Sequence, residues 1–167
     1  MRFFYTIIFY LLLPFILLRL WIKNRHNPAG LQFWYERLGI GLRLAPSGGI
    51  WLHAVSVGES LTAIPLIKAL QLRYPAIPIV VTNETINGAE RIRVGLGNSV
   101  TRLYFPYDLP LILKKFFNKL RPRLLILLET ELWPNLLATC HLYQVPVILI
   151  NGRLSERSAR AYRRILP

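Results

Sequence analysis

Residues 49–60 read GIWLHAVSVGES and place a carboxylate, that of Glu59, where an apolar run ends and a helical pattern begins. A strand, a short turn containing Gly58 and then a helix is how α/β enzymes present a side chain in the crevice outside the carboxyl ends of a parallel sheet. Glu59 is therefore the leading candidate for a general base. A second interpretation stays open, because the helix macrodipole also favours acidic side chains in a first turn, which would make Glu59 a helix cap.

From residue 49 onward the chain alternates strand-like and helical patterns. Apolar runs predict strands at 50–55, 77–82, 101–105, 124–128 and 145–150. Helical patterns lie between them at 61–72, 89–94, 109–120 and 134–143. This βαβα order predicts an α/β fold over residues 49–167, with a Rossmann-like parallel sheet flanked by helices on both faces.

Polar residues follow four of the five predicted strands. Because parallel strands share one direction, these segments converge at one edge of the sheet, where such folds bind ligands. Two acids separated by one residue, Glu129 and Glu131, would repel each other there unless a cation such as Arg91 or Arg153 compensates. Besides Glu59, the candidate site residues are Ser56, Gly58, Thr82, Thr85, Arg91, Glu129, Glu131, Asn151 and Arg153.

The N-terminus is apolar. Residues 3–18 read FFYTIIFYLLLPFILL and carry no charge, so residues 1–23 predict a membrane-anchor helix that either spans the bilayer or lies in its interface. No small-residue cleavage site follows, which favours an uncleaved anchor over a signal peptide, and a buried core helix is the remaining alternative. Lys23, Arg25 and Arg37 follow the segment whereas only Arg2 precedes it, so the positive-inside rule predicts a domain on the cytoplasmic face.

Residues 24–48 form a predicted connector with a short helix at 31–38. Its aromatic residues and Arg37 suit a bilayer interface, and packing against the following domain is an equal alternative.

The composition points to an anionic partner. The chain has 21 Lys and Arg against 8 Asp and Glu, a formal net charge of +13, which suits nucleic acid, phospholipid or a phosphorylated substrate. The apolar N-terminus favours an anionic membrane surface, and without a nucleic-acid-binding motif no nucleic-acid partner is expected. The single cysteine, Cys140, excludes an intrachain disulfide, and the three histidines lack ligand spacing with the acids, so no metal or cofactor is expected.

Six motifs are distinctive in combination: HAVSVGESL at 53–61, IPL at 64–66, GAER at 88–91, PYD at 106–108, ETELWPN at 129–135 and NGRLS at 151–155. Together they closely resemble the N-terminal half of the 3-deoxy-D-manno-octulosonic acid (Kdo) transferases, membrane-anchored bacterial glycosyltransferases, and the resemblance covers nearly the whole chain. It implies the acceptor-binding domain of a two-domain GT-B enzyme of lipopolysaccharide core biosynthesis. That domain would bind the lipid A precursor (lipid IVA), and a C-terminal domain would bind the donor CMP-Kdo.

The resemblance also implies roles for residues. Glu59 would deprotonate the acceptor hydroxyl for metal-independent attack on the anomeric carbon of Kdo, while Arg91, Glu129 and Glu131 would line the cleft. The basic residues of 114–123 would attract anionic phospholipid or the acceptor's phosphates, or else form a solvated helix face. The sequence departs from the family's Thr-Pro-Thr-Gly, which reads Thr85-Ile86-Asn87-Gly88 here.

The family continues into its donor domain where this sequence ends, at Pro167. Three interpretations follow: a fragment of a longer transferase, a truncated or split product that acts only with a donor-binding half, or a non-catalytic membrane-bound module that binds the lipid A precursor.

Overall fold

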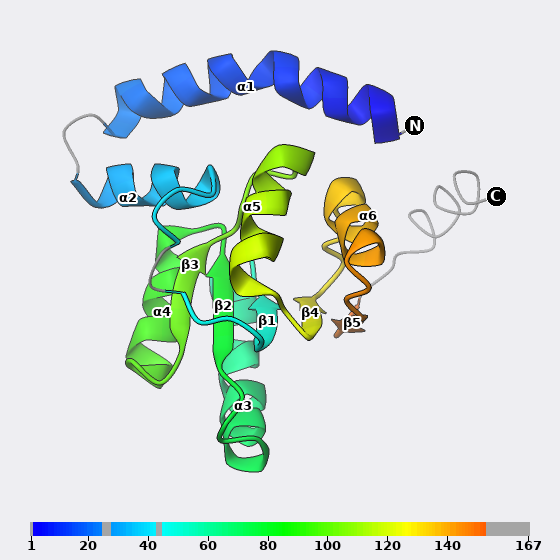
Figure 1. The fold of residues 1–167 in the computed structure, drawn as a ribbon. Helices are drawn as coiled ribbons and strands as arrows, with labels where there is room; N and C mark the ends of the chain where they lie inside the picture. Colours follow the sequence, from blue (N-terminus) through cyan, green and yellow to red (C-terminus); the bar gives the residue numbers. More distant parts are fainter. Residues whose placement is uncertain (1, 25–27, 43–44, 153–167) are drawn as a thin grey trace.

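A single parallel sheet organises the computed structural model, which describes residues 2–24, 28–42 and 45–152. Its strands are β1 (Ile50–His53), β2 (Ile79–Asn83), β3 (Thr101–Tyr104), β4 (Leu124–Leu128) and β5 (Val147–Ile150). The strand order is β3-β2-β1-β4-β5, so the chain winds outward in both directions from β1 (Figure 1). This doubly wound sheet confirms the predicted fold class.

Helices cover both faces of the sheet. They are α1 (Arg2–Asn24), α2 (Pro28–Arg37), α3 (Val57–Arg73), α4 (Ile86–Leu96), α5 (Pro110–Leu120) and α6 (Pro134–Leu142). Successive strand residues point to opposite faces: Trp51 packs in the core cluster with α5 and α6, whereas Leu52 packs in the cluster with α3 and α4. Because both faces are covered, the strands read as continuous apolar runs instead of alternating ones.

The helix α6 takes its N-terminal cap from a distant loop. Its own N-cap residue, Trp133, makes no side-chain capping bond. The carboxylate of Asp108, which follows β3, instead accepts hydrogen bonds from the backbone N–H groups of Asn135 (3.0 Å) and Leu136 (2.7 Å). Burial raises the pKa of Asp108, and these two bonds act in the opposite direction by favouring its charged form.

The helix α1 lies across the end of the domain above α2, α5 and α6 (Figure 1). By length and composition it is long and apolar enough to span a membrane. One stripe of α1 packs against the core cluster of α5 and α6, through Phe9, Leu13, Ile16 and Leu17. These residues, like Tyr5 and Thr6, are only half-buried, and the other described side chains of α1 are exposed, so the alternative of a buried core helix is wrong.

The helix α2 packs on the domain through its C-terminal half. The ring of Phe33 contacts that of Tyr104 on β3 at a centroid distance of 4.5 Å. The predicted short helix therefore exists and packs against the domain. The domain limits 1–23, 24–48 and 49–167 stay predictions.

Candidate active site at the carboxyl edge of the sheet

Glu59 lies in the first turn of α3, directly after β1, and forms a capping box there. The hydroxyl of Ser56 accepts the Glu59 N–H (3.3 Å), and the Glu59 carboxylate accepts the N–H groups of Val55 (2.7 Å) and Ser56 (3.1 Å). The interpretation of Glu59 as a helix cap is thereby confirmed. An ionised carboxylate has about four acceptor positions, so two backbone bonds leave room for a further proton donor.

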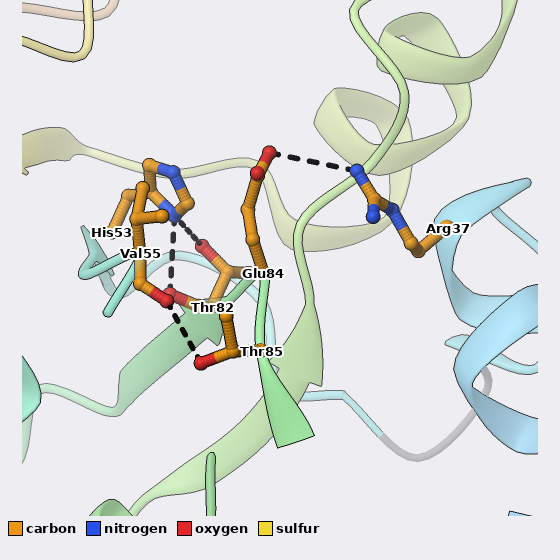
Figure 2. Close-up of polar contacts among 6 residues, drawn as sticks. All are labelled: Arg37, His53, Val55, Thr82, Glu84 and Thr85. Atoms are coloured by element: carbon orange, nitrogen blue, oxygen red, sulfur yellow. Dashed lines mark hydrogen bonds and ion pairs between the residues drawn. The ribbon is translucent and has the colours of Figure 1, made fainter. Parts of the chain in front are cut away.

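The N-terminus of α4 lies beside that of α3. Thr85 caps α4 by accepting the Gly88 N–H (3.0 Å), and its own hydroxyl donates to the carbonyl of Val55 (3.3 Å; Figure 2). A Cβ at Gly88 would lie 3.1 Å from the Ser60 hydroxyl, so glycine permits this close approach. Two positive helix ends therefore meet at the edge where Glu59 sits.

A buried histidine closes the end of β1. His53 Nδ1 lies 3.1 Å from the carbonyl oxygen of Thr82 and 3.0 Å from its hydroxyl (Figure 2). Since a carbonyl only accepts, Nδ1 carries the proton. Burial lowers the pKa of His53 to about 3, so the imidazole is neutral, and its ring stacks on Phe105 at 3.9 Å.

Two carboxyl groups with raised pKa values stand near Glu59. Glu84 follows β2; burial raises its pKa, the charge of Arg37 lowers it and the charge of Glu59 raises it. Burial also raises the pKa of Glu131, followed by the charges of Glu84, Glu59 and Glu129. The charge of Glu59 thus acts on both Glu84 and Glu131, and that of Glu84 acts on Glu131. These three residues are called the edge carboxylates below.

The cation paired with this cluster comes from α2. A guanidinium nitrogen of Arg37 lies 3.5 Å from Glu84 Oε1 (Figure 2), and the guanidinium stacks over the ring of Tyr107 at 4.4 Å. The sequence had suggested Arg91 or Arg153 for this role. Arg91 is exposed on α4, and Arg153 lies outside the described residues.

The remaining predicted residues lie at different depths. Thr82 is completely buried, and its hydroxyl accepts the indole N–H of Trp51 (2.9 Å), so it supports the edge from within. Gly58 is exposed in the first turn of α3. Glu129 and Asn151 follow β4 and β5 with left-handed backbones, φ of 57° and 56°. The segment after β4 is therefore not extended at Glu129.

Sequence reasoning missed Arg37, His53 and Glu84 as members of the site. Glu84 stands between Asn83 and Thr85 in a loop that had been identified, so its position after a strand was the available signal. His53 likewise precedes the Glu59 turn. No local pattern marks Arg37, because only the packing of α2 on the domain brings it to the edge.

These features define a class: an α/β domain that carries acid–base groups at the carboxyl edge of a doubly wound sheet. Sequence comparison specifies the family. A family model described as 3-deoxy-D-manno-octulosonic-acid transferase (Kdo transferase) matches residues 32–167. The chain belongs to this family, which confirms the resemblance found from the motifs.

Several curated relatives carry the same name. A 3-deoxy-D-manno-octulosonic acid transferase of Haemophilus influenzae is 40% identical over 166 residues, which cover 98% of this chain and 39% of the relative. One of Bordetella pertussis is 36% identical, and the match covers 86% of this chain and 36% of the relative. A probable mitochondrial one of Arabidopsis thaliana is 35% identical, and the match covers 77% of this chain and 29% of the relative. The chain thus spans well under half the length of these relatives.

Proposed function

We propose that this chain takes part in the transfer of Kdo from CMP-Kdo to a lipid A precursor (lipid IVA), supplying the acceptor-binding half and the general base. The family assignment supports the reaction type. The observation that carries the site is the Glu59 carboxylate, held by two backbone N–H groups beside Glu84 and Glu131. The donor CMP-Kdo would bind to a second domain of the GT-B architecture.

In the proposed reaction, an acceptor hydroxyl oxygen attacks the anomeric carbon of Kdo and transfers its proton to Glu59. The bond from that carbon to the phosphate oxygen of CMP breaks, and CMP leaves with the electron pair. The backbone bonds from Val55 and Ser56 fix the carboxylate, so the base is oriented before the acceptor arrives.

Contacts to the acceptor sugar are proposed for the polar groups around Glu59. The exposed start of α3 at Gly58 and the Thr85 hydroxyl flank it, and Glu129 and Asn151 extend the edge beyond β4. The residues proposed to contact the acceptor sugar also include Ser56, Arg91, Glu131 and Arg153. The buried Thr82 acts instead through His53. No metal step is proposed.

The helix α1 is the proposed anchor to the bacterial inner membrane, with the domain on the cytoplasmic face. Its length and apolar composition support attachment to a bilayer. Exposed Lys114, Lys115 and Arg121 on and after α5 support attraction to an anionic surface or to the acceptor's phosphates.

A pair of variants separates base from cap. Glu59→Gln keeps the capping-box residue type, whereas Glu59→Ala removes both functions. We expect the chain, combined with a donor-binding half and supplied with CMP-Kdo and lipid A precursor, to lose transfer in both variants. Ser56→Ala is compared with them in stability only, because it removes the other half of the capping box while Ser56 is itself a proposed acceptor contact. Near-normal transfer by Glu59→Gln would show that Glu59 is a cap and not the base.

The alternative, a non-catalytic module, is tested with the 167-residue chain before and after a donor-binding half is added. Binding of lipid A precursor by this chain, together with no transfer after a donor-binding half is added, would favour the module over the enzyme. Transfer on adding that half would favour the enzyme.

A further inference from the structure

The helix α1 contacts the domain from Tyr5 to Leu17. Near its start, the Thr6 hydroxyl donates to the side-chain oxygen of Asn135 (3.1 Å), and the hydroxyl of Tyr5 hydrogen-bonds the carboxylate of Asp108. Further along, Ile16 and Leu17 pack against the core cluster of α5 and α6. The docked length from Tyr5 to Leu17 is 12 residue steps, about 18 Å at 1.5 Å per residue.

The two sides of α1 differ in accessibility. The docked stripe is half-buried and consists of Tyr5, Thr6, Phe9, Leu13, Ile16 and Leu17. The opposite side, called the free stripe here, is apolar and open: Phe4, Leu11 and Leu18 are 69%, 66% and 55% exposed. A continuous row of large exposed apolar side chains indicates a surface that contacts a membrane or another apolar partner.

A bilayer-spanning orientation conflicts with the docked stripe. A spanning helix crosses about 30 Å of hydrocarbon and is surrounded there by lipid or other apolar helices. Keeping about 18 Å of α1 against the domain would draw Asp108 and Asn135 into the hydrocarbon as well. Releasing α1 would instead leave the Asp108 carboxylate without its Tyr5 partner and expose the apolar surface beneath Phe9.

We propose that α1 lies in the plane of the membrane, with its free stripe in one leaflet of an anionic phospholipid bilayer and its docked stripe on the domain. This inference rests on the proposed membrane attachment and adds its geometry. Interfacial helices of this kind bury one apolar face by about 5–10 Å into the headgroup and acyl boundary.

Charges beside α1 fit anionic headgroups. A groove of about 370 Å³ between α5 and α6 is lined by Leu111, Lys114 and Leu142. A neighbouring groove of about 320 Å³ is lined by Arg2 and Asn135 among others and shares Pro110 and Leu142 with the first. Each groove combines apolar side chains with a cation and lies beside the docked N-terminal half of α1, which favours an anionic lipid leaflet as the occupant.

The geometry brings the sheet edge to the lipid surface. The segments that contact α1 are the loop at Tyr107–Asp108 and the start of α6 at Asn135, and they follow β3 and β4 at the same edge as the edge carboxylates. The charge of Glu84 acts on both Tyr107 and Tyr5. In the plane of the membrane, α1 therefore holds this edge next to headgroups, so a lipid-linked sugar reaches Glu59 without leaving its leaflet.

Impermeant thiol labelling tests the orientation. In a Cys140→Ala background, Arg2→Cys and Ser47→Cys place one thiol at the start of α1 and one in the exposed loop before β1. Cells expressing the full chain are treated as spheroplasts and as inverted membrane vesicles. In-plane α1 predicts that both thiols react only in inverted vesicles. Reaction of Arg2→Cys in spheroplasts, or recovery of the chain in the soluble fraction, would overturn the proposal.

Depth and charge provide two further readouts. Fluorophores on cysteines at Phe4, Leu11 and Leu18 should be quenched equally by a shallow lipid quencher, whereas a deeper Leu11 would indicate spanning. On vesicles containing phosphatidylglycerol, Lys114→Gln should bind about fivefold more weakly, since one basic residue near such a surface contributes about 1 kcal/mol. Lys68→Gln, exposed on α3, is the control, and an equal loss there would refute the orientation. None of these readouts depends on Kdo transfer.

Discussion

The buried, neutral His53 predicts a pH dependence of stability that one substitution isolates. Its folded pKa is about 3 against an ordinary value of 6.5, because burial disfavours the imidazolium. Between these values the unfolded chain binds the proton and the folded chain does not. Stability from His53 is therefore complete above pH 6.5 and decreases as the pH falls toward 3.

The magnitude follows from the two pKa values. Lowering the pH from 7 to 5 decreases the free energy of unfolding by about 2 kcal/mol through His53. Asp108, Glu84 and Glu131 act with the opposite sign, since their raised pKa values make the folded state bind protons more tightly in acid. The free energy of unfolding of the wild-type protein alone would therefore change less between pH 7 and pH 5, because the His53 and carboxyl contributions partly cancel.

His53→Asn removes the titration and keeps an amide N–H in place of Nδ1–H. Urea unfolding in non-ionic detergent, followed by tryptophan fluorescence at pH 7, 6 and 5, gives the difference in unfolding free energy between the two proteins. The carboxyl contributions cancel in this difference. We expect the wild-type advantage to shrink by about 2 kcal/mol from pH 7 to pH 5. A difference that does not change with pH would refute the assignment of a buried neutral imidazole.

Three further predictions use the same unfolding assay or a titration. Gly49→Ala should lower the free energy of unfolding by about 3 kcal/mol, because the new Cβ would lie 2.0 Å from the Pro78 carbonyl oxygen. Gly58→Ala should fold normally, because the nearest atom to its Cβ would lie at 3.9 Å, and equal stabilities of the two variants would contradict this contrast. Asp108→Asn should cost about 1–2 kcal/mol by weakening the α6 cap, whereas Glu90→Gln, in an exposed ion pair, should cost clearly less. Equal losses would contradict the capping role. Arg37→Met should raise the pKa of Glu84 further in a carboxyl NMR titration, because it removes the paired cation, whereas Arg93→Met should leave that pKa unchanged. An unchanged pKa of Glu84 in Arg37→Met would exclude the pairing.

Sequence was sufficient for the sheet because burial on both faces produces continuous apolar runs. The run at 124–128 matches β4 at both ends. The helix α3 begins at Val57, four residues before the apolar pattern predicted, because the capping box of Ser56 and Glu59 sets its start. The spacing Ser-x-x-Glu is itself the capping signature, so the cap was readable from sequence alone.

The site was predicted less completely because part of it depends on packing between distant elements. The convergence of Ser56, Thr85 and Glu131 follows from strand direction alone. The burial of Thr82 depends instead on which side of β2 its side chain occupies. The pairing of Arg37 with Glu84 depends on the packing of α2 on the domain, which no local sequence pattern indicates. The proton affinities of Glu84 and Glu131 require burial, which a sequence does not specify.

The long-range cap by Asp108 also constrains the order of folding. Asp108 and Asn135 are 27 residues apart, so α6 gains its cap only after the chain from β3 through α5 and β4 has brought them together. A peptide of residues 134–142 lacks that carboxylate and is too short to be a stable helix in water. The helix α6 therefore consolidates late, together with the tertiary structure, and a fragment that begins after Asp108 would leave this segment unstructured.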